Sequence, residues 1–131
     1  MPETETPRPT DAELEILKVI WRRGPSTVRE VFESLSETKG TGYTTVLKLM
    51  QIMAEKGLVV RDESERAHRY EAAAPEDETQ RRLVGDLLRK AFDGAAAKLV
   101  MQALSTRRAS AEELSQIRRM LDELEGKRRR R

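Results

Sequence analysis

The chain of 131 residues contains no cysteine, which excludes disulfide frameworks and metal sites built on thiolates. Its single histidine has no second imidazole to complete a zinc site, so we expect neither a metal nor a cofactor. No stretch approaches the roughly 20 apolar residues of a transmembrane helix, and residues 1–10 lack the apolar run of a signal peptide. A cytoplasmic protein is the simplest interpretation.

Aromatic residues are also scarce, at 4% of the chain, whereas hydrophobic and charged residues make up 37% each. This composition favours helices with narrow buried stripes over a sandwich of β-strands, so the predicted fold class is mainly α. No nucleophile, base and acid group into a catalytic constellation, which indicates that the chain is not an enzyme.

The formal net charge is only +2, and its distribution matters more than its sum. Residues 1–74 carry 11 Lys/Arg against 13 Asp/Glu, a net charge of −2, whereas residues 127–131 alone contribute +5. DNA binding must therefore be argued from where the basic groups lie. The basic tail, residues 126–131, is either a disordered solubilising end or an arm that binds phosphate without reading sequence.

Capping signals and apolar periodicity predict two short helices at the start of the chain. Thr10 and Glu13 form a capping box, apolar residues then recur at helical spacing, and Gly24-Pro25 ends the first helix. Either residue of Ser26-Thr27 can cap the second helix. Residues 1–9, rich in proline and glutamate, are expected to be disordered.

A third predicted helix follows a turn at residues 38–42 and ends near Gly57, where glycine suits a left-handed cap. One face carries the apolar stripe Val46, Leu49, Met50 and Met53. The opposite face begins with short hydroxylated side chains, which allow close approach to a phosphate backbone and to base edges. The residues that this face offers for DNA contact are Tyr43, Thr44, Lys48 and Gln51; a merely solvated face is the alternative.

Two strand patterns follow at residues 58–61 and 67–71, joined by a polar connection that makes a β-hairpin. Three short helices and a hairpin are the pattern of a winged helix-turn-helix domain, predicted here for residues 10–74. In such a domain the third helix enters the major groove, and the hairpin, or wing, touches the flanking backbone or the minor groove.

Residues 75–125 are predicted to be helical, with a break near Asp93-Gly94 and a capping box at Ser110 and Glu113. Three such helices cannot close a core alone below roughly 70 residues. An identical chain is the simplest partner, so we predict a helical dimerisation domain; folding back onto the first half is the alternative. The residues predicted at the dimer interface are Leu83, Leu87, Leu88, Phe92, Leu99, Val100, Leu104, Leu114, Ile117, Leu121 and Leu124.

Four motifs occur in order along residues 10–125. They are DAELEILKVIW, STVREVFESL, GYTTVLKLMQIMAEKGLV with the wing VRDESERAHRYEAA, and LVGDLLRKAFDGAAAKLVMQAL followed by ASAEELSQIRRMLDELE. Together they resemble the penicillinase-repressor (BlaI/MecI/CopY) family of winged-helix transcriptional repressors. The resemblance implies a homodimer that binds a palindromic operator and blocks transcription, with half-sites about one helical turn (roughly 34 Å) apart.

The resemblance also assigns DNA contacts to individual residues. Those matching the family's recognition helix are Tyr43, Thr44, Thr45 and Lys48. Those matching its wing are Arg66, His68 and Arg69, with Arg61 as a weaker candidate. Many relatives have glycine at the wing tip where Ser64-Glu65 stands here, which leaves the turn type open and places an acidic side chain near the DNA.

The inducing signal stays open. In the best-known members, a membrane-embedded zinc protease sensor responds to β-lactams, and the repressor is cut between Asn and Phe; by resemblance, such a sensor is a candidate partner. Gln102-Ala103 stands at the matching position, so the same cleavage specificity is not expected. The copper-responsive branch ends in a cysteine-rich motif, which this chain lacks.

Two other functions remain as alternatives. A winged-helix module can bind a protein through its third helix, and a weak dependence of binding on salt would favour that function over DNA binding. A protein that coats DNA without sequence preference would rely on the basic tail, so deleting residues 127–131 would abolish its activity. Activators share the architecture, which leaves the direction of control open.

Overall fold

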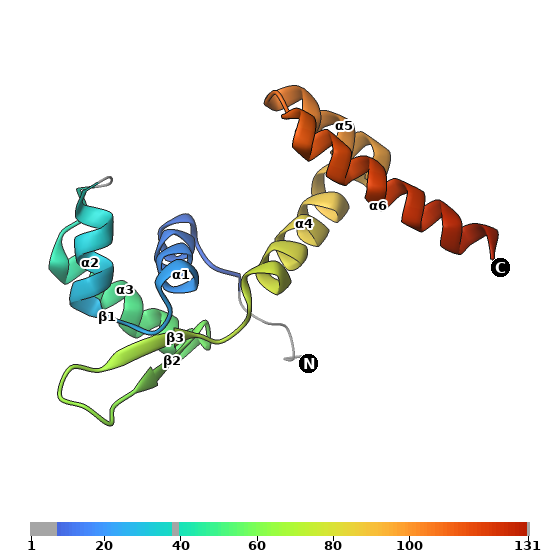
Figure 1. Cartoon of the computed structure of the whole chain (residues 1–131). Coiled ribbons are helices and arrows are strands. Elements are labelled where there is room, and N and C mark those ends of the chain that lie inside the picture. The colour runs from blue at the N-terminus through green and yellow to red at the C-terminus, as the bar shows by residue number, and fades with distance from the viewer. Residues whose placement is uncertain (1–7, 38–39, 131) are drawn as a thin grey trace. The chain divides into compact units, whose positions relative to one another are not determined.

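A computed structural model describes residues 8–37 and 40–130, which belong to two compact units (Figure 1). The boundary between the units falls at Val84 and Gly85, inside one helix. Most of the segment predicted to be disordered, and part of the predicted turn at residues 38–42, lie outside the described residues. Within the described residues, no helix has both the length and the apolar character needed to span a bilayer.

Three helices form most of the first unit: α1 (Asp11–Arg23), α2 (Val28–Ser36) and α3 (Tyr43–Lys56). The predicted capping box of α1 is confirmed, since Thr10 Oγ1 accepts from the Glu13 N–H and the Glu13 carboxylate accepts from the Thr10 N–H. The same reciprocal pair, Thr27 and Glu30, starts α2. Gly57 ends α3 with φ at 84°, the left-handed conformation predicted for it.

An antiparallel sheet of three strands packs with these helices, in the order β1–β3–β2. The strands β2 (Val59–Asp62) and β3 (Arg69–Ala72) form the predicted hairpin, and β1 (Ser26–Thr27) pairs with β3. The sequence did not predict β1, because two residues are too short to show a period and their pairing partner lies far along the chain. The arrangement is the predicted winged helix-turn-helix (Figure 1).

The core of the first unit is built from the predicted apolar stripes. Val46, Met50 and Met53 of α3 are fully buried, and Leu49 packs partly buried beside them. The other buried apolar residues are Ile16, Leu17, Val19, Ile20, Val28, Val31, Leu35, Leu58, Val59 and Tyr70. Because α3 is anchored along its whole length, its opposite face is held rigidly toward solvent.

A buried ion pair joins the start of α1 to the end of α3. The Glu13 side chain is 2% exposed, and Lys56 Nζ lies 2.8 and 2.9 Å from its two carboxylate oxygens. Burial raises the pKa of Glu13, but the hydrogen bonds from Lys56 and Thr10, together with the Lys56 charge, outweigh it and hold the pKa below its ordinary value. Glu13 therefore stays ionised while it both caps α1 and positions α3.

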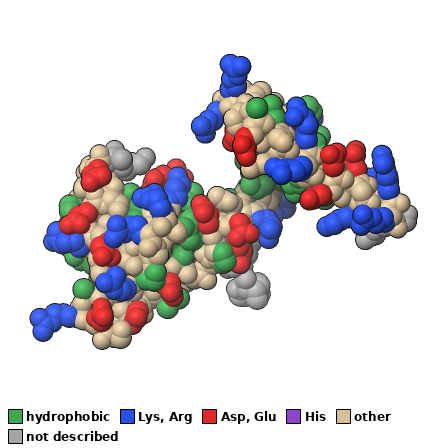
Figure 2. All heavy atoms as spheres, viewed as in Figure 1, with side chains coloured by type: hydrophobic (Ala, Val, Ile, Leu, Met, Phe, Trp, Pro, Cys, Tyr) green, Lys and Arg blue, Asp and Glu red, His purple; other side chains and the backbone are tan. Residues whose placement is uncertain are grey.

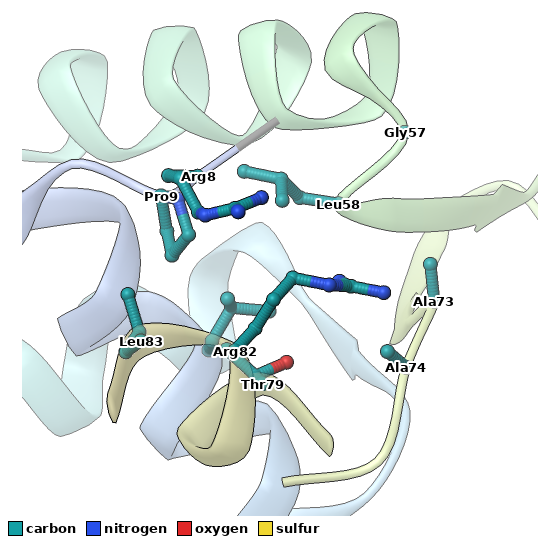
Figure 3. A pocket seen from close by; sticks show the side chains of 10 residues that line it. Arg8, Pro9, Gly57, Leu58, Ala73, Ala74, Thr79, Arg82 and Leu83 are labelled. Atoms are coloured by element: carbon teal, nitrogen blue, oxygen red, sulfur yellow. The ribbon is translucent and has the colours of Figure 1, made fainter. Parts of the chain in front are cut away.

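The helix α4 (Glu76–Phe92) begins inside the first unit, so that unit extends beyond the boundary predicted at residue 74. Thr79 is buried, and it lines a small cavity of about 30 Å³ together with Leu17, Leu58 and Leu83 (Figure 3). Trp21 Nε1 also donates to the Ala74 carbonyl oxygen at 3.0 Å, just before α4. Leu83, predicted for the dimer interface, thus lies against the core of the first unit.

The second unit is helical, as predicted. Asp93 and Gly94, with φ at 49° and 82°, interrupt the helical conformation between α4 and α5 (Ala96–Thr106). The capping box of Ser110 and Glu113 then starts α6 (Ala111–Arg129). The basic tail is helical as far as Arg129 rather than disordered, because α6 continues through it without a break.

Candidate nucleic-acid interface

The N-terminal part of α3 presents a polar surface to solvent. Thr44, Lys48 and Gln51, predicted to lie opposite the apolar stripe, are exposed, and so is Thr45. Gly42 precedes the helix and has no side chain to accept a first-turn N–H. These N–H groups, together with the positive end of the helix dipole, make the tip a site for an anion such as a phosphate.

The Tyr43 ring is held in place by residues of α2. Phe32 packs edge-on against it, with ring centroids 5.6 Å apart and planes at 79°, and the Arg29 guanidinium carbon lies 5.1 Å from the ring centroid. These contacts leave Tyr43 38% exposed, so it remains able to approach a ligand. The sequence analysis missed Arg29, because only the packing of α2 on α3 brings it beside Tyr43.

A groove runs between α3 and the wing and brings most of the predicted contact residues together. Its polar lining includes Arg29, Gln51, Arg61, Arg66 and His68. The other lining residues are Thr27, Val28, Tyr43, Leu47, Ala67 and Tyr70. Thr44, Thr45 and Lys48 lie on the exposed face of α3 rather than in this groove. The surface therefore has two parts, the helix tip and the groove.

The wing closes its turn without glycine. Asp62 Oδ1 accepts the Ser64 N–H at 2.9 Å, and this hydrogen bond lowers the pKa of the Asp62 carboxyl. Glu65 Oε1 lies 3.7 Å from Arg69 Nε. The acidic side chain at the tip is therefore partnered within the wing, which reduces the repulsion that an unpaired carboxylate would exert on DNA.

The wing arginines differ in whether they form ion pairs with acidic side chains. Arg61 Nε lies 2.7 Å from Glu63, and Arg69 Nη1 lies 3.4 Å from Glu30 on α2. Arg66 and Lys48 are exposed and pair with no acidic group among the described residues, whereas the Arg29 guanidinium lies over the Tyr43 ring. Figure 2 shows a basic side chain projecting from the wing. Arg66 and Lys48 are thus the cations best able to meet phosphates without breaking an existing pair.

Glu30 links the wing to the start of α2. Its carboxylate accepts from the Thr27 N–H at 2.9 Å and lies 3.7 Å from Arg23 and 3.4 Å from Arg69. The hydrogen bond from the Thr27 backbone, followed by the charges of Arg69 and Arg23, holds the pKa of Glu30 below its ordinary value despite partial burial. Arg69 consequently has a structural role beside any contact with DNA.

Replacing Arg66 and Arg69 separately should distinguish contact with DNA from support of the fold. Arg66→Ala is expected to weaken DNA binding about 3- to 10-fold with no change in thermal stability, because it removes the phosphate contact predicted for this exposed side chain. Arg69→Ala should weaken binding and also lower the free energy of unfolding by about 0.5–1 kcal/mol, since it releases Glu30 and Glu65. Filter binding and thermal melts of both variants test this. Equal stability of the two variants would contradict the structural role of Arg69.

No cluster of three or more His, Asp or Glu side chains capable of holding a metal occurs in residues 8–37 and 40–130. The assembled surface instead offers hydroxyls, one amide, a helix N-terminus and unpaired cations. Hydroxyl and amide groups can read base edges, and the cations and N–H groups suit phosphate oxygens.

Comparisons with known proteins point to the same chemistry. Residues 9–123 match the family model described as penicillinase repressor. The transcriptional regulator BlaI of Mycobacterium tuberculosis is 36% identical over 88% of this chain and 83% of its own length. The penicillinase repressor of Bacillus licheniformis is 26% identical over 89% of this chain and 91% of its own length.

A solved structure is similar to part of this chain. It is the solution structure of monomeric Bacillus licheniformis BlaI in complex with the blaP half-operator, with 28% sequence identity and a TM-score of 0.50. The match covers 56% of this chain and 90% of that one.

Proposed function

We infer, because the chain belongs to the penicillinase repressor family, that it represses transcription as a homodimer bound to an inverted-repeat operator. The chain is a sequence-specific DNA-binding transcriptional repressor, in keeping with its BlaI relatives and with the half-operator complex of a similar DNA-binding domain. The homodimer, the operator symmetry and the residue roles below are our proposals. We expect the protein to act in the cytoplasm and to have no catalytic activity of its own.

The observation that carries the proposal is the pairing of an open helix tip with a groove leading to the wing. Thr44 and Lys48 stand on the exposed face of α3, while Gln51 and Arg66 line the groove beside it. We propose that the tip of α3 reads bases in the major groove and that the wing binds the flanking phosphates. The division of contacts explains why the hydroxylated residues and the free arginine lie on different elements.

The second unit supports the proposal of a dimer. The end of α4, together with α5 and α6, leaves large apolar side chains exposed, among them Leu87 at 49%, Leu121 at 54% and Leu124 at 50%. The other large apolar residues exposed in this unit are Val100, Met101, Leu104 and Met120. Such a surface is unfavourable in water, and a second copy of the same chain would cover it with an identical surface.

Induction is proposed to act on this second unit. By family resemblance, a membrane protease sensor is a candidate partner. Gln102 and Ala103 are exposed but lie within α5, so a protease would need that helix to unfold locally before cutting. Since these residues also depart from the Asn-Phe pair, we expect a different cleavage position or a different signal.

Selection of bound fragments from randomised double-stranded DNA tests the proposed function. An inverted repeat with half-sites about one helical turn apart is the expected result. Retention of DNA without a common motif would instead support a coating protein. Recovery of no DNA would support a protein-binding module and overturn the proposal.

Thr44→Ala should relax the base preference at one position of each half-site. Losing the hydroxyl and methyl contacts of one residue is expected to reduce discrimination by about 1–3 kcal/mol, with a smaller loss on random DNA. Repeating the selection with the variant would measure this. Thr106→Ala in α5 is the matched control, because it removes the same groups from an exposed helical site in the other unit. An unchanged motif would remove Thr44 from the reading surface.

A further inference from the structure

The end of α6 carries a charge run that the proposed reading surface does not use. Lys127, Arg128 and Arg129 are consecutive, exposed and helical. At about 100° per residue, three successive side chains point to different sides of a helix. The last large apolar residue of α6 is Leu124, so no apolar stripe continues into this segment. Figure 2 shows basic side chains near this end of the chain.

The run decides the sign of the protein's net charge. Residues 1–126 carry 20 Lys/Arg and 23 Asp/Glu, a net charge of −3, and residues 127–131 add +5 to give +2. The match to the family model ends at residue 123, so the run lies outside the part that this chain shares with the family. A role for it must therefore be argued from this chain alone.

The chemistry of the basic run limits the kinds of partner that it can bind. A membrane-surface helix needs an apolar face to insert, and none continues past Leu124. Favourable interaction with the helix dipole explains cations in the last turn, at about 0.3–1 kcal/mol, but it does not require five in succession. Charges on all sides of a helix suit a polyanion whose phosphates are met without a fixed register, as in duplex DNA.

We propose that residues 127–130 bind DNA phosphates and strengthen attachment to operator and non-operator DNA alike. The inference rests on the proposed function for the identity of the polyanion. It assigns sequence reading to the first unit and sequence-independent attachment to the end of α6. The phosphates come either from the duplex that α3 reads or from a second duplex, and the two sources are separable by experiment.

The test compares two neutralised arginine pairs of the same helix. Arg128→Gln/Arg129→Gln removes two charges from the run, and Arg118→Gln/Arg119→Gln removes two exposed charges from the middle of α6. Affinity for a random duplex is measured from low to moderate salt. The tail variant is expected to reduce the slope of log affinity against log salt by about 2 per chain, while the mid-helix variant leaves it unchanged.

Two results would overturn the proposal. An unchanged slope in the tail variant would mean that the run does not touch DNA, and an equal reduction in both variants would mean that net charge alone matters. Helical content by circular dichroism and the mass of the assembly verify that each variant keeps its structure. A chain ending at residue 126 provides a second measurement. It should reduce the slope of log affinity against log salt more than the tail variant does.

The tail and the repressor proposals fail independently. If the wild-type protein selects no motif but the tail pair still reduces the slope, sequence reading is wrong and the tail assignment stands. If a motif is selected and the slope is unchanged, only the tail assignment is wrong. Capture of a second labelled duplex by immobilised complex, lost in the tail variant, would place the phosphates on another DNA molecule; no capture would place them on the same one.

Discussion

Leu121→Glu is expected to convert the proposed dimer into monomers and to weaken binding to a complete inverted repeat by roughly 10²- to 10⁴-fold. Leu121 lies in α6 and is 54% exposed, on the same helical face as Leu114, Ile117 and Leu124. A carboxylate there would be desolvated without a partner in an apolar interface. Light scattering measures the mass, and titrations of full and half operators measure the lost coupling between sites.

Gln116→Glu is the matched control for this experiment. It places the same negative charge on α6 at an exposed polar position, so the mass and the affinity for the complete repeat should stay close to those of the wild type. Binding of a single half-site should be similar in all three proteins, because the first unit is untouched. A Leu121→Glu protein that remains dimeric would show that the interface lies elsewhere.

Lys56→Met is expected to lower the free energy of unfolding by about 3 kcal/mol at neutral pH. The substitution replaces the aliphatic part of the lysine with an unbranched apolar side chain one atom shorter, and it leaves the Glu13 carboxylate, 2% exposed, without its cationic partner. Lys56 itself is 31% exposed, which places the effect at the lower end of that for buried pairs. DNA binding should weaken only when α3 begins to unfold.

The pH dependence of this loss has a definite direction. The folded pKa of Glu13 lies below its ordinary value of 4.5, so its stabilisation is complete above that pH and is lost as the pH falls through the folded pKa. In Lys56→Met the carboxyl can protonate at little cost, so the gap in stability between wild type and variant should narrow at acid pH. Urea unfolding at several pH values below 7 measures it.

Lys18→Met serves as the control for the ion pair. Lys18 Nζ lies 3.1 Å from Glu15 on the same helix as Glu13, but both side chains are substantially exposed, at 51% and 35%. Losing the pair between Lys18 and Glu15 should lower the free energy of unfolding by less than about 0.5 kcal/mol. If the two lysine variants were equally stable, the pair between Glu13 and Lys56 would have no special role in holding α1 and α3 together.

Local signals in the sequence determined where most elements begin and end. Thr10 with Glu13 and Ser110 with Glu113 could be recognised as capping boxes because both partners lie within one helical turn. Gly57 could also be recognised as the end of α3, because a left-handed cap depends on a single glycine. The polar face of α3 was equally predictable, since a regular helix assigns each residue to a face from its number alone.

Tertiary structure decided the features that join distant parts of the chain. Strand β1, the Arg29 contact with Tyr43 and the placement of Leu83 beside the first core have no local signature. Arg69 likewise looked free for DNA in the sequence, and only the fold brings it to Glu30. Capping and periodicity act over a few residues and can be read along the chain, whereas these contacts depend on how whole helices pack, which no short segment encodes.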